Sequence, residues 1–220
     1  MIEHILFDLD GTLADTADDL ANALNAIRLQ HELTALPKEV IRPTVSLGGN
    51  AMIKLAFGLE EGESGFETIR DDFLNYYRAN IAQETRLFDG MEELLLSLEN
   101  ENKPWGIVTN KSSWLTGPLV EAMSLDKRAA CIISGDTLQQ KKPHPAPILH
   151  ACKLMQSNPA TTIYIGDAQR DIEAGRRAGT KTLIALYGYI DDDDDPYTWC
   201  ADGMVSSAFE IYEKLSEFCN

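Results

Sequence analysis

The chain has 220 residues, of which 44% are apolar and 25% are charged, a balance typical of a folded globular protein rather than a disordered one. A chain of this length holds one large domain, or a domain of ordinary size with a smaller one inserted into it. The formal net charge of −16 disfavours nucleic acid and anionic membrane surfaces as partners, because no basic stripe is present to bind their phosphates. A small anionic substrate is still allowed if a metal ion or a few lysines supply local positive charge.

From the sequence we expect neither a secretion signal nor a membrane span. Its start, MIEHILFDLDG, has acidic residues inside the apolar run and lacks a basic beginning, and eighteen consecutive apolar residues occur nowhere. The four cysteines have neither CxxC spacing nor histidines at metal-ligand intervals, so we expect ordinary thiols without disulfides at Cys131, Cys152, Cys200 and Cys219. We therefore expect a cytoplasmic protein that is a monomer or a small homo-oligomer.

The first predicted element is a buried strand over residues 2–9, which is short, rich in branched and aromatic residues and closed by Gly11. A helix is expected to follow from about Asp15. Asp15, Thr16 and Asp18 would supply its N-cap and first-turn carboxylates.

Helical patterns dominate the next part of the chain. They cover residues 39–45, 50–57 and 66–81 and are separated by glycine-rich pieces. Because strand patterns are scarce here, we expect residues 15–85 to form a helical cap domain inserted after the first strand. The cap would sit above the place where ligands bind.

From Gly90 onward, predicted helices and strands alternate. The expected strands are residues 105–109, 130–134, 161–165 and 182–186, with helices between them and a final helix to residue 218. This alternation predicts an α/β fold with a Rossmann-like, mainly parallel sheet that binds ligands at the carboxyl ends of its strands. The core domain would comprise residues 1–14 and 86–220. The acidic run at 191–195 is expected to be a solvated turn.

Two carboxylates stand at the end of the first predicted strand. Asp8 and Asp10 are two residues apart, so their side chains point the same way, and Gly11 allows the backbone to turn close to a ligand. Alone, such a pair is equally typical of solvated aspartates at a strand end. Other polar stretches decide between these interpretations.

Three further stretches place polar side chains where strands are expected to end. They are Thr109-Asn110-Lys111, Lys141-Lys142-Pro143 and Gly166-Asp167 with Asp171 in the following helix. Each has an ordinary alternative: loop residues for the first, a surface lysine pair for the second and helix capping for the third. Because all would converge at one edge of a parallel sheet, together they are more specific than any one alone, and the hydroxyl, amide and ammonium groups of residues 109–111 suit a phosphate.

The order and spacing of these stretches resemble the haloacid dehalogenase superfamily of phosphotransferases. The superfamily's pattern is DxDGT, then serine or threonine, then lysine, then GDxxxD, and it is matched by Asp8, Asp10, Gly11, Thr12, Thr109, Lys142, Asp167 and Asp171. The resemblance spans the chain and includes the alanines and glycine of the helix after the last motif.

The resemblance implies a phosphatase that acts through an aspartyl phosphate. Asp8 would be the nucleophile, and Asp10 would protonate the leaving oxygen and then activate water. Thr109 and Lys142 would bind the phosphoryl oxygens, with Asn110 in support. Dehalogenases and phosphonate-cleaving members lack the second aspartate, so the presence of Asp10 excludes those reactions.

The resemblance also implies a Mg²⁺ ion. Its ligands would be the Asp8 carboxylate, the Asp10 backbone carbonyl and Asp167, with Asp171 as a further or water-mediated ligand. Hard oxygen ligands of this kind select Mg²⁺. The substrate would be a small phosphomonoester.

Several substrates fit the resemblance. Residues 109–111 and 141–147 look like phosphoglycolate phosphatase-like members, whereas residues 187–190 and the following Pro196 and Trp199 look closer to N-acetylmuramic acid 6-phosphate phosphatases. A β-phosphoglucomutase-like phosphosugar mutase would use the same two aspartates and is an alternative of another class. A non-catalytic phosphate-binding module is disfavoured, because every expected catalytic position is filled.

One loop of the predicted cap is a candidate for substrate selection. Ser46, Gly48, Gly49 and Asn50 would form it, since glycine allows close approach of the backbone to a ligand. An ordinary turn within the cap is the alternative. We expect substitutions at Ser46 or Asn50 to reorder substrate preference while sparing a small artificial ester.

Overall fold

A computed structural model describes residues 2–191 and 193–218 of the chain. Within these residues, six parallel strands form one sheet in the order β5-β4-β1-β6-β7-β8. The strands are β1 (His4–Phe7), β4 (Trp105–Val108), β5 (Ile132–Ile133), β6 (Thr162–Gly166), β7 (Lys181–Ala185) and β8 (Gly203–Val205). The predicted α/β fold with a parallel sheet is confirmed.

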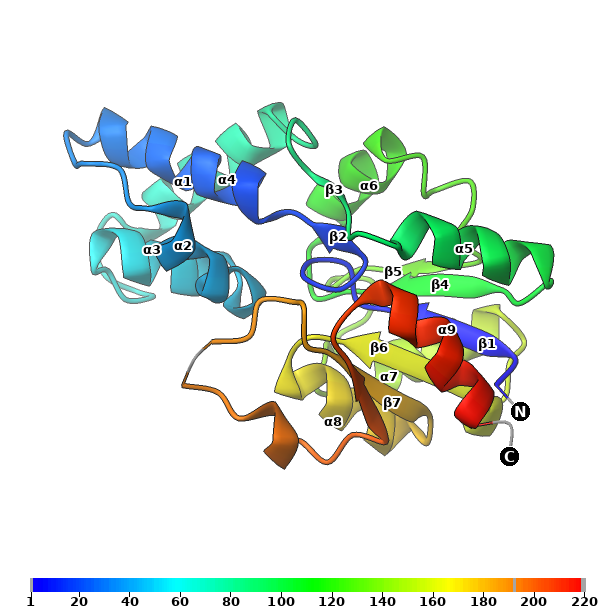
Figure 1. Cartoon of the computed structure of the whole chain (residues 1–220). Coiled ribbons are helices and arrows are strands. Elements are labelled where there is room, and N and C mark those ends of the chain that lie inside the picture. The colour runs from blue at the N-terminus through cyan, green and yellow to red at the C-terminus, as the bar shows by residue number, and fades with distance from the viewer. Residues whose placement is uncertain (1, 192, 219–220) are drawn as a thin grey trace.

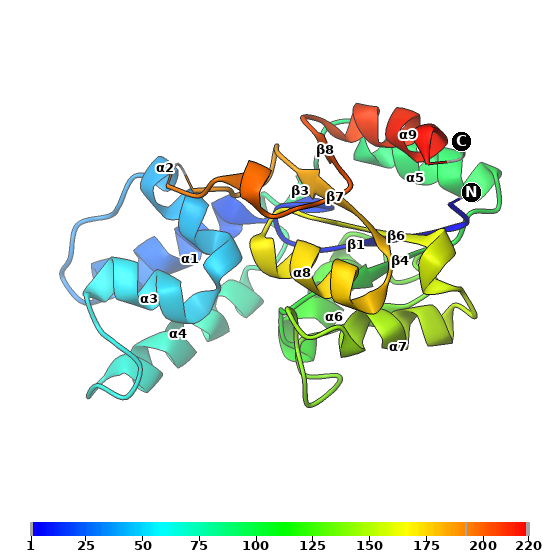
Figure 2. The same ribbon diagram turned by 90° about the horizontal axis from the view of Figure 1, so that it is seen from below.

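Helices cover both faces of the sheet. Figure 2 shows α5 (Met91–Asn100) and α9 (Ala208–Glu217) on one face and α7 (Ala146–Leu154) and α8 (Gln169–Ala178) on the other. In β1, Ile5 and Phe7 belong to the apolar cluster of the first face and Leu6 to that of the second. Alternating side chains of one strand are thus buried on both sides, which explains its continuous apolar sequence.

The register of the three central strands brings their carboxyl ends together. Phe7 of β1 lies opposite Ile107 of β4 on one side and Ile165 of β6 on the other. The residues that follow these strands therefore emerge at one edge of the sheet. Ligands of open parallel sheets bind at such an edge.

Residues 17–79 form a group of helices set apart from the sheet, here called the helical segment (Figure 1). It contains α1 (Ala17–Gln30), α2 (Lys38–Ile41), the 3₁₀ helix η1 (Arg42–Leu47), α3 (Gly49–Phe57) and α4 (Phe66–Ala79). Leu24, Ile53 and Phe73 lie in its own apolar cluster, which extends to Leu115 and Tyr189 from the rest of the chain. The segment is therefore packed against the part of the chain that carries the sheet.

A small antiparallel ribbon joins the helical segment to the sheet. Its strands are β2 (Ala14–Asp15) and β3 (Arg86–Leu87), which pair with each other. Two-residue strands give too little alternation to be recognised in a sequence, and this ribbon was not predicted. The limits of 15 and 85 fall at the ribbon, and the division into a cap and a core domain stays a prediction.

Other elements differ in detail from expectation. The strand predicted over 130–134 is limited to Ile132–Ile133, and β8 was not predicted. The helix predicted over 39–45 is split into α2 and η1. Helix α6 (Ser113–Ala122) begins after β4 as expected.

Two predictions fall partly outside the described residues. In the acidic run, Asp191 and residues 193–195 are exposed, while Asp192 lies outside the description. Cys131, Cys152 and Cys200 are free thiols, and Cys219 lies outside as well. Among the described residues, we find no helix with the length and apolar character needed to cross a membrane.

Candidate active site

A cavity of ≈ 580 Å³ separates the carboxyl edge of the sheet from the helical segment. The sheet side of its lining includes Asp8, Asp10, Thr109, Asn110, Lys111, Lys142 and Arg170. The helical side includes Ser46, Leu47, Gly48, Gly49, Asn50 and Arg70. Most of the site residues predicted from the sequence thus meet around one space.

Lys142 lies at the centre of the polar groups under the cavity. Its Nζ is 2.9 Å from Asp8 Oδ1 and 2.7 Å from Asp171 Oδ1, and its side chain is completely buried. Nζ also lies within hydrogen-bond distance of the Val108 carbonyl, at 3.0 Å, and the Tyr164 hydroxyl, at 2.7 Å. A buried ammonium held by so many oxygens has a fixed position, which suits a group that must stabilise charge on a substrate.

The approach of Lys142 differs from the sequence prediction in one respect. It does not follow a strand directly but comes from the loop between β5 and α7. Asn110 holds this loop: its Nδ2 donates to the Lys142 carbonyl at 2.9 Å, and its Oδ1 accepts from the Lys142 N–H at 3.0 Å. Asn110 therefore holds the backbone of Lys142 in place, and it also lines the cavity.

Asp8, Asp167 and Asp171 form a buried acidic triad. One carboxylate oxygen from each lies within 4.8 Å of the others. Burial raises the pKa of Asp8 to about 6, although Lys142 opposes the shift. Burial and the neighbouring Asp8 and Asp171 carboxylates raise the pKa of Asp167 to about 7. The three carboxylates repel one another because the end of β1, the end of β6 and the first turn of α8 bring them together.

A divalent cation fits this triad. All three side chains offer carboxylate oxygens, the donors that Mg²⁺ and Ca²⁺ prefer, and a cation would relieve the repulsion between them. Asp8, Asp167 and Asp171 are therefore the residues that would hold it. Asp10, the fourth predicted ligand, would contribute only its backbone carbonyl, since its side chain points elsewhere.

Two glycines allow the backbone to approach Asp167 closely. Gly11 has φ +83°, and a Cβ there would lie 2.1 Å from Asp167 Oδ2. At Gly188 a Cβ would lie 2.3 Å from Asp167 Cβ. Side chains at these positions would displace a member of the triad, which gives a steric reason for glycine at both.

Asp10 has a separate set of partners. Its Oδ1 accepts from Lys111 Nζ at 2.9 Å and from Thr16 Oγ1 at 2.7 Å. Lys111 is buried, and its Nζ lies 4.7 Å from the centre of the Tyr77 ring on α4. Burial alone would lower the pKa of Lys111, but Asp10 and Tyr77 raise it above its ordinary value. Asp10 is thus placed between the sheet edge and the helical segment.

Thr109 is buried beside the triad at the end of β4. Its Oγ1 accepts from the Lys111 N–H at 3.1 Å, which fixes the turn that follows the strand. Because it lines the cavity, its hydroxyl is available to a ligand there.

The predicted substrate loop reaches the sheet edge through Ser46. Its Oγ donates to Asp167 Oδ2 at 2.8 Å, so a residue of the helical segment touches the acidic triad. Asn50 instead donates to Glu61 Oε2 at 2.9 Å on the exposed side. Gly48 and Gly49 line the cavity at the start of α3. Ser46 therefore contacts the acidic triad as well as lining the cavity, and its sequence context did not suggest the contact with the triad.

Three residues with evident roles were missed by the site prediction. Lys111 pairs with Asp10, and Tyr189 donates its backbone N–H to Asp167 Oδ2 at 2.9 Å. Arg170 lines the cavity, and among the described residues its buried Nε has no hydrogen-bond partner. Lys111 and Arg170 stand inside stretches already singled out, so their charge was a usable signal. The sequence around Tyr189 gives no local signal for its contact with Asp167.

Comparisons with known proteins indicate the family of the chain. The family model of the haloacid dehalogenase-like hydrolases matches residues 5–185. An N-acetylmuramic acid 6-phosphate phosphatase from Pseudomonas putida is 40% identical over 210 residues, covering 96% of this chain and 94% of its own length. A phosphoglycolate phosphatase from Xanthomonas campestris is 39% identical over 209 residues, with 95% and 94% covered.

Solved structures agree with this assignment. The crystal structure of a predicted phosphoglycolate phosphatase from Haemophilus somnus superposes with a TM-score of 0.85 and 26% identity, and 97% of each chain is covered. The chain therefore belongs to the haloacid dehalogenase-like hydrolase family and stands among its phosphatases.

Proposed function

We propose that the protein is a Mg²⁺-dependent phosphatase that hydrolyses a small organic phosphomonoester through a phosphorylated Asp8. One observation carries the proposal: Asp8 lies in the acidic triad, 2.9 Å from Lys142, under a cavity large enough for a substrate. A nucleophilic carboxylate, a cation site and a fixed ammonium are thereby combined around the place where a phosphoryl group would bind.

In the first step, an Asp8 carboxylate oxygen attacks phosphorus while the bond from phosphorus to the ester oxygen breaks. Asp10 gives its proton to that oxygen, which leaves as an alcohol. In the second step, Asp10 takes a proton from water, and the water oxygen attacks phosphorus. The bond to Asp8 breaks, and inorganic phosphate is released. Bound Mg²⁺ would supply charge stabilisation for the phosphoryl oxygens, together with Lys142 and Thr109.

The surroundings of Asp10 support its part in the second step. Lys111 at 2.9 Å stabilises the carboxylate that remains after the first proton transfer, which is the form needed to activate water. Thr16 at 2.7 Å orients the same oxygen. Asp10 needs no contact with the triad for this role.

Between the substrates named for the relatives, the cavity favours N-acetylmuramic acid 6-phosphate over 2-phosphoglycolate. A space of ≈ 580 Å³ is within the range of about 300–1,000 Å³ that encloses ligands of drug size. A two-carbon acid would leave most of it to water. Leu47, Phe73 and Leu74 give the cavity apolar walls suited to the face of a sugar ring and its substituents.

The test is a panel of phosphomonoesters incubated with the purified chain in Mg²⁺, with released phosphate as the readout. We expect N-acetylmuramic acid 6-phosphate to give a kcat/KM at least about tenfold above that of 2-phosphoglycolate. A higher kcat/KM for 2-phosphoglycolate would contradict the substrate assignment but not the proposal that the protein is a phosphatase. Release of phosphate from neither compound nor from any other phosphomonoester, or undiminished release after exhaustive chelation, would contradict the proposal itself. The cytoplasmic location and the oligomeric state stay predictions.

A further inference from the structure

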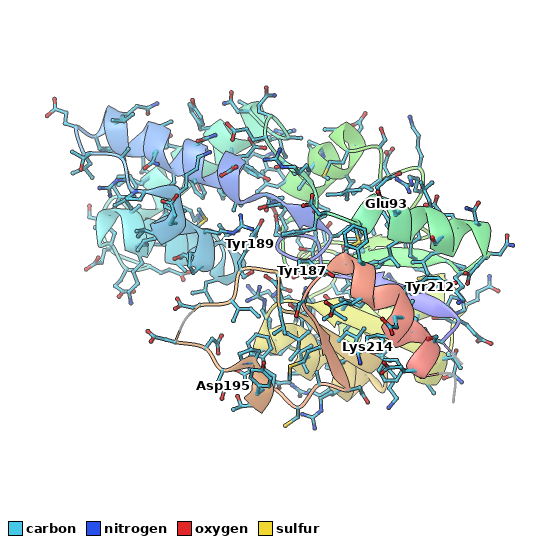
Figure 3. The ribbon with its side chains drawn as sticks, viewed as in Figure 1. Glu93, Tyr187, Tyr189, Asp195, Tyr212 and Lys214 are labelled. Carbon is cyan, nitrogen blue, oxygen red and sulfur yellow. The ribbon has the colours of Figure 1, made fainter. Side chains whose placement is uncertain are left out.

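Tyr189 lies in the loop after β7 and is buried at the junction between the sheet and the helical segment (Figure 3). Its ring belongs to the apolar cluster of the helical segment, although it comes from the other end of the chain. Its backbone N–H is bound to Asp167 Oδ2. One residue therefore contacts both a member of the acidic triad and the helices above it.

The Tyr189 hydroxyl stands at the start of α1. It accepts from the Thr16 N–H at 2.6 Å and the Ala17 N–H at 3.0 Å, and it donates to Asp15 Oδ1 at 2.7 Å. The first N–H groups of a helix lack partners within the helix. The sequence predicted that Asp15, Thr16 and Asp18 would serve them, but Thr16 makes no side-chain cap and Asp15 reaches Ala17 only at 3.4 Å. A tyrosine 173 positions beyond Thr16 does most of the capping.

The contacts continue from Asp15 into η1. Arg42, the first residue of η1, binds both Asp15 oxygens, at 2.9 and 3.0 Å, and lies 4.8 Å from the centre of the Tyr189 ring. The same 3₁₀ helix carries Ser46, which returns to Asp167. The contacts thus form a closed circuit from Asp167 through Tyr189, Asp15, Arg42 and Ser46 back to Asp167.

We infer that Tyr189 is a positioning residue whose hydroxyl sets the orientation of the helical segment over the acidic triad. It fixes the start of α1 directly and fixes η1 through Asp15 and Arg42. The catalytic consequence rests on the proposed function, because the helical segment would then orient the leaving group of the substrate. The structural consequence does not depend on that function.

The structural part is tested by amide hydrogen exchange on the full chain with Tyr189→Phe. This change removes the hydroxyl but keeps the ring and the backbone N–H bound to Asp167. We expect the amides of residues 16 and 17 to exchange on the order of fivefold faster, as for a lost helix cap, and those within residues 42–50, apart from Pro43, at least about twofold faster. Unchanged exchange at 42–50 would reduce Tyr189 to a local cap and overturn the inference.

Two further variants make the exchange result specific. Tyr187→Phe is the matched control, since that hydroxyl donates to the Thr12 carbonyl at 3.0 Å and should leave both regions unchanged. Arg42→Gln breaks the later part of the circuit in a half-exposed side chain, so the fold should survive. It should loosen residues 42–50 while residues 16 and 17 keep their protection. Equal loosening of both regions by Tyr187→Phe, or no loosening by Arg42→Gln, would contradict the circuit.

A kinetic readout tests the catalytic consequence. In Tyr189→Phe, kcat/KM for a phosphosugar should fall on the order of tenfold, while that for acetyl phosphate falls less than about threefold, because a small leaving group gains little from orientation. Mg²⁺ affinity, measured by calorimetry, should stay within about twofold, since Asp167 keeps its backbone partner. Equal loss for both substrates would overturn the positioning role. A wild-type chain without activity would instead defeat the proposed function and leave the exchange result to stand.

Discussion

The sheet edge and the helical segment line the same cavity but present different kinds of surface to it. At the sheet edge the charged side chains of Asp8, Lys142 and Asp171 are at most 5% exposed, and each lies against an opposite charge. On the helical side, Leu47 is 63% exposed, and the Asn50 side chain donates to Glu61 on the exposed surface. Buried charges keep one geometry, whereas exposed side chains can adjust to what enters.

This difference suggests a division of labour. A rigid edge suits phosphoryl transfer, which needs fixed charges, and an adaptable surface suits recognition of a varied organic group. Several contacts cross the division, among them Ser46 with Asp167 and Tyr77 with Lys111. This division can be tested by substitutions at the sheet edge, on the helical side and at the contacts between them.

The largest effect should follow from Asp8→Asn. It removes the nucleophile while leaving a side chain of the same size, so kcat should fall by about 10⁴-fold or more for every substrate. Circular dichroism should be unchanged. A variant of Asp8 that retains activity near wild type would show that the edge does not work by covalent transfer.

Lys142→Ala should cut kcat/KM by about a hundredfold or more, by similar factors for all substrates, because the lost charge faces the transferred group. It also leaves Asp8 and Asp171 without their shared cation, so the melting temperature without metal should fall. Lys141→Ala is the matched control. Its exposed side chain also lines the cavity, and its loss should cost less than about tenfold. If Lys142→Ala lowered kcat/KM for some substrates and not for others, Lys142 would belong to substrate recognition, and the boundary drawn here between chemistry and recognition would be wrong.

The sequence predicts the same effect for substitutions at Ser46 and at Asn50, whereas the structure predicts different effects. Ser46→Ala removes a donor to Asp167, so we expect a loss of roughly three- to tenfold even with a small ester, together with weaker activation by Mg²⁺. Asn50→Ala should change the order of preference among substrates and spare the small ester. The measurement is a substrate panel with a Mg²⁺ titration on both variants. A selective effect at Ser46 without a change in Mg²⁺ activation would restore the expectation drawn from the sequence.

The acidic triad should limit stability in the absence of metal. Because the pKa of Asp8 rises to about 6 and that of Asp167 to about 7, these two groups hold more protons in the folded chain than in the unfolded chain between about pH 4 and 7. Their contribution to stability should therefore fall as pH rises through this window. Asp167→Asn removes one of these groups, so its melting temperature in EDTA should exceed that of wild type by at least about 2 °C at pH 8 and by less at pH 5. A difference of the opposite sign would contradict the raised pKa of Asp167.

Sequence reasoning captured the sheet edge better than the helical side, for physical reasons. The polar residues of the edge lie in short stretches that follow strands, so the positions of Asp8, Thr109 and Asp167 could be predicted once the strands were recognised. Contacts that bring distant segments together have no local signal. Tyr189 capping α1 and Ser46 reaching Asp167 depend on how the helical segment packs, which periodicity does not specify.

The same limit explains the misjudged details. Lys142 was expected near a strand end, but it reaches the site through a loop held by Asn110, a pairing 32 residues apart in sequence. The ribbon of β2 and β3 has too few residues to show alternation, although it joins the two parts of the molecule. The positions of the motif residues along the sheet edge were therefore predictable, and the links between regions were not.

The central claim is that the edge of the sheet transfers a phosphoryl group through Asp8, and trapping that intermediate tests it most directly. Asp10→Asn should slow attack by water, while acetyl phosphate, whose leaving group needs little protonation, can still phosphorylate Asp8. Acid quenching and mass spectrometry of this variant with Mg²⁺ should then find a phosphoryl group on the peptide that contains Asp8, with an initial burst of acetate close to one per chain. A burst with the phosphoryl group on another residue, or slow turnover with neither burst nor label in a variant that still hydrolyses acetyl phosphate, would contradict the account.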